Sequence, residues 1–222
     1  MKREVIKTAD GSKTLFIPEM DEHYHSVNGA LTESEYVFLK QGYLHHYSGS
    51  PVIFEVGFGT GLNALVTALK AEEQKRKTRF ISIEKYPLSV DELKNLEYDK
   101  LISNTAANVF HKIHMANWNE EVEITDFFSL HKIKADIKTF PFSNLSPFDV
   151  IYFDAFAPDK QPGLWNPEIF ENIFKACSKG AIFVTYSAKG IIRRRLESVG
   201  YKIERLPGPP KKRQMMRGIK IL

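Results

Sequence analysis

The sequence contains one cysteine, Cys177, and seven histidines. A single cysteine excludes an internal disulfide and a metal site built from several thiolates. The histidines show no spacing that is typical of a metal site, so we expect no bound metal. The scarcity of cysteine also favours the reducing cytoplasm as the compartment of this protein.

Long apolar runs are absent too. No run approaches the roughly 20 residues that a membrane-spanning helix needs. Residues 1–13 are charged and lack the apolar segment of a signal peptide. We therefore expect a cytoplasmic protein that has no membrane partner.

Neither sign of charge dominates the sequence. The 31 lysines and arginines only slightly outnumber the 27 acidic residues, which gives a formal net charge of +4. Such a mild excess permits a polyanionic partner but does not require one. Basic residues are concentrated near the C-terminus, at Lys211, Lys212 and Arg213. That segment is the first candidate for contact with a polyanion.

No repeat, low-complexity segment or linker divides the 222 residues. This length suits one domain with a small appendage. We expect residues 1–50 to form an N-terminal appendage and residues 51–222 to form the main domain.

The appendage has two predicted elements. Residues 4–17 alternate around an Asp-Gly pair, which is typical of a β-hairpin. Residues 32–47 predict a helix, with Thr32 as its N-cap and Glu35 completing a capping box. A hairpin followed by a helix should therefore precede the main domain.

Strands alternate with helices from residue 52 onward, which indicates an α/β fold with a mostly parallel sheet covered on both faces. The predicted strands are residues 52–56, 79–84, 127–133, 148–154, 180–186, 201–206 and 215–222, and the predicted helices are residues 61–76, 87–102, 167–178 and 188–198. The turn at 207–214 is too short for a crossover helix, so the last strand should run antiparallel. A mostly parallel sheet with one antiparallel strand near the C-terminus resembles the Rossmann-like sheet of methyltransferases.

The segment EVGFGTGLN connects the first core strand to the first core helix and ends at Asn63. Gly57, Gly59 and Gly61 would allow a tight turn and close approach of the backbone to a ligand. Glu55, two residues before the first glycine, would repel the pyrophosphate of a dinucleotide. It could instead accept hydrogen bonds from the ammonium of an amino-acid-like ligand. The motif therefore favours S-adenosylmethionine over nicotinamide and flavin dinucleotides.

Two further acids follow the next core strands. Glu84 ends the second strand, at a position where an acid can hold ribose hydroxyls. Asp136 follows the third strand and could accept a hydrogen bond from the adenine amino group. The alternative for both is an ordinary surface acid. This alternative has more support for Asp136, because its neighbours in the sequence are polar. Together with the glycine motif, the acids predict a complete S-adenosylmethionine site.

Asp154 lies at the end of the fourth core strand, within the segment FDVIYFDAFAPDKQPGLW. A carboxylate at the carboxyl end of a parallel strand lies where open α/β sheets bind ligands. The alternative is an acid that merely begins a turn. With the cofactor placed, we expect Asp154 beside the reacting methyl group, as a catalytic residue.

Four segments together resemble one family, the methyltransferase component (MnmC-type) of tRNA 5-methylaminomethyl-2-thiouridine biosynthesis: HSVNGALTESEYVFL, EVGFGTGLN, FDVIYFDAFAPDKQPGLW and GPPKKRQM. The resemblance implies S-adenosylmethionine-dependent N-methylation of the 5-aminomethyl group of 5-aminomethyl-(2-thio)uridine at the tRNA wobble position. In bifunctional relatives an FAD-dependent oxidase half makes that amine. Because the sequence ends at Leu222, we expect a stand-alone enzyme without an FAD site, and a separate enzyme that supplies the amine.

The resemblance also implies roles for residues outside the cofactor motif. Asn28 and Gly29 would close over the cofactor. Phe156 and Trp165 would stack on the flipped-out wobble base, although Trp165 could equally pack its loop onto the sheet. The residues that would neutralise anticodon phosphates are Lys211, Lys212 and Arg213.

Two other functions stay open at this point. The first is a methyltransferase that acts on an amine of a protein or small molecule. The second is a non-catalytic module that binds S-adenosylmethionine. The four acids Glu55, Glu84, Asp136 and Asp154 argue against a module that has lost its activity.

Overall fold

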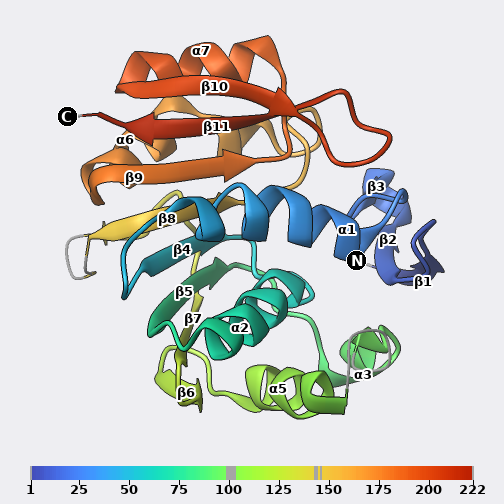
Figure 1. The fold of residues 1–222 in the computed structure, drawn as a ribbon. Helices are drawn as coiled ribbons and strands as arrows, with labels where there is room; N and C mark the ends of the chain where they lie inside the picture. Colours follow the sequence, from blue (N-terminus) through green and yellow to red (C-terminus); the bar gives the residue numbers. More distant parts are fainter. Residues whose placement is uncertain (1, 99–103, 143–144, 146, 222) are drawn as a thin grey trace.

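The computed structural model describes residues 2–98, 104–142, 145 and 147–221. Within these ranges, eight strands form one sheet in the order β10-β11-β9-β8-β4-β5-β7-β6 (Figure 1). Their bounds are β4 Val52–Val56, β5 Thr78–Glu84, β6 Glu121–Thr125, β7 Phe128–Lys134, β8 Phe148–Phe153, β9 Cys177–Thr185, β10 Tyr201–Pro207 and β11 Gln214–Lys220. The predicted α/β fold is confirmed.

The strand directions follow the connections between them. The central pairs β4–β5, β4–β8, β5–β7 and β8–β9 are parallel. β11 runs antiparallel to both β10 and β9, as the short turn before it predicts. Leu222, at the end of the predicted last strand, lies outside the described residues. β6 is a second antiparallel strand, at the far edge of the sheet, which was not predicted.

Helices cover both faces of the sheet (Figure 1). Their bounds are α2 Leu62–Gln74, α3 Val90–Lys94, α5 Asn104–Met115, α6 Pro167–Lys175 and α7 Gly190–Val199. The prediction of one helix over 87–102 was wrong, since α3 is short and α5 was not anticipated; residues 99–102 lie outside the described part. None of the helices in the described residues is long and apolar enough to cross a bilayer.

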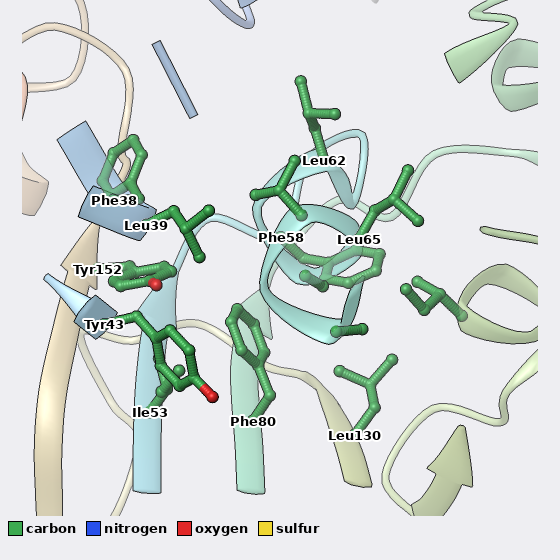
Figure 2. Close-up of a cluster of buried hydrophobic side chains, with 14 of the residues drawn as sticks. Phe38, Leu39, Tyr43, Ile53, Phe58, Leu62, Leu65, Phe80, Leu130 and Tyr152 are labelled. Carbon is green, nitrogen blue, oxygen red and sulfur yellow. The ribbon is translucent and has the colours of Figure 1, made fainter. Parts of the chain in front are cut away.

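Each face of the sheet has its own hydrophobic core, because successive residues of a strand point to opposite faces. Ile53 belongs to the core beneath α2 and α5, whereas its neighbour Phe54 belongs to the core beneath α6 and α7. Figure 2 shows the first of these cores, where Phe38 and Tyr152 lie close together. Their ring centroids are 5.3 Å apart.

The N-terminal segment forms a small antiparallel sheet of β1 (Glu4–Lys7), β2 (Lys13–Ile17) and β3 (Glu22–His23). The predicted hairpin is thereby confirmed. In Figure 1 this sheet lies at the end toward which the parallel strands point. The N-terminal residues are therefore placed beside the carboxyl ends of the strands, where a ligand of this fold would bind.

The helix after this sheet begins earlier than predicted. α1 (Ala30–Glu33) continues directly into the π-helix η2 (Ser34–Lys40) and is followed by the 3₁₀ helix η3 (Tyr43–His45). The predicted capping box is wrong, because Thr32 is inside the helix and donates from its amide and hydroxyl to Asp10, at 3.0 and 2.7 Å. Asp10 of the hairpin turn thus accepts a hydrogen bond from an amide of the first helical turn, which a local N-cap side chain would otherwise accept.

Candidate active site

A cavity of about 460 Å³ lies at the carboxyl ends of β4, β5, β7 and β8. This volume is within the range of small-molecule sites, roughly 300–1,000 Å³. The residues on its wall come from the strand ends and from the N-terminal segment: Arg3, Ile17, Met20, Tyr24, His25, Val56–Gly59, Ile83–Tyr86, Ala135–Lys138, Asp154–Phe156 and Gln161–Leu164. The cavity therefore lies where the sequence predicts a ligand.

The glycine turn after β4 needs its glycines for two reasons. Gly57, Gly59 and Gly61 have φ angles of +93, +49 and +72°, which side chains disfavour. A Cβ atom on Gly57 would also lie 2.7 Å from the backbone oxygen of Asp154, and one on Gly59 would lie 3.2 Å from Tyr24. Gly57 and Gly59 thus let the turn pack closely against the Asp154 backbone and the Tyr24 ring, whereas Gly61 is the N-cap of α2.

Glu84 and Asp136 both line the cavity, at the ends of the neighbouring strands β5 and β7. Glu84 accepts hydrogen bonds from the amides of Gly59, at 3.3 Å, and Tyr86, at 2.7 Å. Asp136 pairs with the Lys85 ammonium at 2.9 Å. The hydrogen bond from Lys85 lowers the pKa of Asp136 below its usual value. The structure brings together these two predicted acids on one wall.

Glu55 lies behind this wall rather than on it. Its side chain is buried, with the residue 1% exposed. It accepts hydrogen bonds from Asn63 Nδ2 at 3.0 Å and from Ser82 Oγ at 2.5 Å. Burial raises the pKa of Glu55 well above its usual value. Direct contact of Glu55 with an ammonium stays a prediction, and its observed contacts hold the first turn of α2.

Asp154 is connected to the same turn of α2. Asn63 Nδ2 donates to Asp154 Oδ2 at 2.8 Å, so one amide group bridges two carboxylates. The backbone amide of Asp154 donates to Val56 O at 3.0 Å. Burial, followed by the nearby charge of Glu33, raises the pKa of Asp154 to about 8. The cavity wall therefore holds a fixed carboxyl group that can change its ionisation near neutral pH.

The two predicted aromatic residues are in different places. Phe156 lines the cavity and meets Tyr24 edge-on, with ring centroids 5.0 Å apart. Trp165 is completely buried, and its Nε1 donates to Phe156 O at 2.8 Å. The prediction that Trp165 stacks on a base is wrong, because Trp165 packs against Phe153 beneath the loop. These contacts agree with the alternative role, in which Trp165 holds the loop on the sheet.

Asn28 and Gly29 do not lie on the described wall of the cavity. Gly29 is the N-cap residue of α1, and a Cβ atom there would lie 2.4 Å from Asp10 Oδ2. The N-terminal segment reaches the cavity through other residues that sequence reasoning missed, chiefly Arg3, Tyr24 and His25. The presence of His25 at the start of the HSVNGALTESEYVFL motif was the available signal.

The predicted basic cluster is divided. Lys211 and Arg213 are exposed, as contact with phosphates would require. Lys212 instead forms an ion pair with the buried carboxylate of Glu33. Its ammonium also lies 5.0 Å from the centre of the Tyr186 ring. Lys212 is therefore a structural partner of the N-terminal segment and not a free phosphate ligand.

The described residues contain no group of three or more His, Cys, Asp or Glu side chains that could hold a metal ion. What they do contain fits S-adenosylmethionine. Gly57 and Gly59 lie on the wall and present backbone to a ligand there. Acidic acceptors at adjacent strand ends suit its hydroxyl and amino groups.

Comparison with known proteins agrees with this chemistry. Residues 91–221 match a family described as S-adenosyl-L-methionine-dependent methyltransferases, and the chain belongs to this family. S-adenosylmethionine is accordingly its cofactor. The chain is similar to the crystal structure of MnmC2 from Aquifex aeolicus, with 27% identity and a TM-score of 0.76 over 98% of this chain and 70% of that one. A spermidine synthase, with 15% identity and a TM-score of 0.57, shares the fold.

Curated relatives point in the same direction. Two are the tRNA 5-methylaminomethyl-2-thiouridine biosynthesis bifunctional proteins MnmC of Aeromonas salmonicida and Paraburkholderia xenovorans. They are 31% and 32% identical over 89% and 92% of this chain. The chain spans about a third of their length, 32% and 33% respectively.

Proposed function

We propose that this methyltransferase transfers a methyl group from S-adenosylmethionine to the primary amine of 5-aminomethyl-(2-thio)uridine at the tRNA wobble position. The product is 5-methylaminomethyl-(2-thio)uridine. The observation that carries the proposal is the Asp154 carboxyl group, which Asn63 holds on the wall of the cofactor cavity. The names of the MnmC relatives, which refer to tRNA 5-methylaminomethyl-2-thiouridine biosynthesis, support tRNA and this product nucleoside.

The wall of the cavity offers a partner for each part of the cofactor. Glu84 would accept hydrogen bonds from the ribose hydroxyls, and Asp136 from the adenine amino group. The turn at Gly57 and Gly59 would lie against the methionine part. Glu55 supports this arrangement from behind through Asn63. When bound, the cofactor supplies a methyl group on a positively charged sulfur.

Asp154 would act on the acceptor amine. Only a neutral amine is a nucleophile, and its lone pair must point at the methyl carbon when the C–S bond breaks and the N–C bond forms. A carboxylate that accepts a hydrogen bond from the amine fixes this direction. The pKa of Asp154, raised to about 8 by burial, also allows it to take up a proton that the amine releases. Orientation is the main role and proton uptake the secondary one.

The substrate side of the cavity carries the groups that an RNA would meet. Phe156 lies on the wall, where an unstacked base can pack against an aromatic ring. Lys211 and Arg213 are exposed on the turn between β10 and β11 and can approach phosphates. The amine itself would be produced by a separate enzyme.

The proposal is tested by nucleoside mass spectrometry. tRNA from cells that lack the gene should accumulate the 5-aminomethyl nucleoside, and the purified protein with S-adenosylmethionine should convert it to the methylated form. An unchanged tRNA profile would reject the RNA substrate in favour of a protein or small-molecule amine. Absence of methyl transfer to any amine would leave only cofactor binding.

A further inference from the structure

Two segments from opposite ends of the chain meet beside the loop that follows β8, residues 154–165, which we call the acceptor loop. Glu33 is the last residue of α1 and only 5% exposed. One of its oxygens pairs with the ammonium of Lys212, in the turn between β10 and β11, and the other accepts the amide of Ser26 at 2.9 Å. A second contact joins the same two segments, because Tyr36 Oη donates to Pro207 O at 3.2 Å.

This ion pair is connected to Asp154 through one aromatic residue. The Lys212 ammonium lies 5.0 Å from the centre of the Tyr186 ring. Tyr186 Oη donates at 2.9 Å to the backbone oxygen of Ala155, the residue after Asp154. The pair therefore braces the first turn of the acceptor loop.

The pair also contributes charge near the Asp154 carboxyl group. Burial raises the pKa of Asp154 most, the charge of Glu33 raises it further, and the charge of Lys212 lowers it. The groups that face Asp154 from the surrounding elements are Glu55 of β4, Glu33 of α1, Lys212 of the β10–β11 turn and Tyr186 after β9. Glu33 and Lys212 have opposite charges and opposite effects.

We infer that the Glu33–Lys212 ion pair is a positioning element of the methyl-transfer site, which braces the Asp154–Ala155 turn and balances the charge beside the Asp154 carboxyl group. This inference rests on the proposed function, because the ion pair would give Asp154 an ionisation that suits an amine substrate. The charge balance itself is a property of the folded chain. It can therefore be measured without any RNA.

The experiment follows the ionisation of Asp154 by NMR of protein that carries isotope-labelled aspartate, with Asp154→Asn assigning the signal. Glu33→Gln should move the titration midpoint to lower pH by about one unit, because a negative charge is lost while Lys212 remains. Lys212→Met should move it to higher pH by about as much. The double variant should titrate close to the wild-type midpoint, since both charges are removed together.

Two further variants keep the test decisive. Lys211→Met removes the exposed neighbouring charge and should leave the midpoint in place. Glu33→Asp withdraws the carboxylate by one methylene and should give a smaller shift in the direction of Glu33→Gln, which serves if the Gln variant does not fold. Opposite shifts support the inference, and absent or same-direction shifts overturn it. Failure of the protein to methylate tRNA would reject the proposed function but leave these midpoints unchanged.

Discussion

Asn63 Nδ2 lies 2.8 Å from Asp154 Oδ2, and this hydrogen bond connects the start of α2 to the acceptor loop. The same nitrogen donates to Glu55 at 3.0 Å. Asn63→Ala removes both bonds and frees Asp154 to rotate. We expect turnover to fall by about 10- to 100-fold, because misplacement of a positioning group by about 1 Å has an effect of this size. Steady-state kinetics would show the reduced kcat, and calorimetric titration with S-adenosylhomocysteine would show a smaller loss of cofactor affinity, because the same amide connects Glu55 to the first turn of α2.

Asp154→Asn should reduce turnover more strongly than it reduces cofactor binding. The amide keeps the shape of the side chain but cannot hold the amine in the same way or accept its proton, so we expect a loss of about 100-fold or more. Asp159→Asn is the matched control, since Asp159 belongs to the same loop and pairs on the surface with Lys189. Full activity in Asp154→Asn would remove this residue from the mechanism.

The ionisation of Asp154 should make stability depend on pH. Its pKa rises from 3.8 to about 8 on folding, because burial disfavours the charged form. Between these values the folded state holds a proton that the unfolded state has lost, so this contribution to stability is complete at low pH and is lost as pH rises toward 8. The free energy of unfolding, measured with urea, should fall less over this pH window in Asp154→Asn than in the wild-type protein. The difference should be at least about 1 kcal/mol. Parallel pH curves for both proteins would contradict the assignment.

Gly57→Ala should abolish most cofactor binding. The added Cβ would lie 2.7 Å from Asp154 O, and the φ angle of +93° already disfavours a side chain. Gly180→Ala is a matched control, because Gly180 has a φ angle of +80° but no atom within 4 Å of the added Cβ. Both variants should lose about 1–3 kcal/mol of stability from backbone strain. Only Gly57→Ala should bind S-adenosylhomocysteine at least about 10-fold more weakly, as measured by calorimetry.

Removing Lys211 and Arg213 together should weaken tRNA binding in a salt-dependent manner. Each lost phosphate contact lowers the slope of log affinity against log salt by about 0.7–0.9. Cofactor affinity should stay the same, because neither residue lines the cavity. Lys202→Ala provides the comparison, as Lys202 is an exposed lysine of β10. The measurement is tRNA binding at several salt concentrations. An unaltered slope of log affinity against log salt would show that these residues do not contact the RNA.

The positions of the central strands along the chain and the places of the main acids could be predicted from sequence, because hydrophobic runs and glycine turns are local signals. Glu84, Asp136 and Asp154 each follow an apolar strand, and parallel strands bring their carboxyl ends to one edge. β6 was not predicted, because it is a short edge strand in which Glu121 and Glu123 are exposed. Such a segment lacks the apolar run of a central strand.

Other features depend on contacts between distant residues. A tryptophan in a loop can face a ligand or the core, and only the packing of Trp165 against Phe153 decides between them. The ion pair between Glu33 and Lys212 joins positions that are 179 residues apart. No local pattern indicates such a pair. Lys212 was therefore assigned to RNA when its partner belongs to the protein.

The position of β11 has a consequence for the synthesis of this protein. β11 is made after β10 but lies between β9 and β10, where it hydrogen-bonds to both. A nascent chain that lacks residues 214–220 leaves a gap in the sheet, so β10 has no neighbour on which to pair. The turn that carries Lys212 is joined at one end to β10 and at the other to β11. A chain without these residues should therefore fail to hold Lys212 against Glu33 and Tyr186, and these contacts should form only after β11 is inserted between two strands that are made before it.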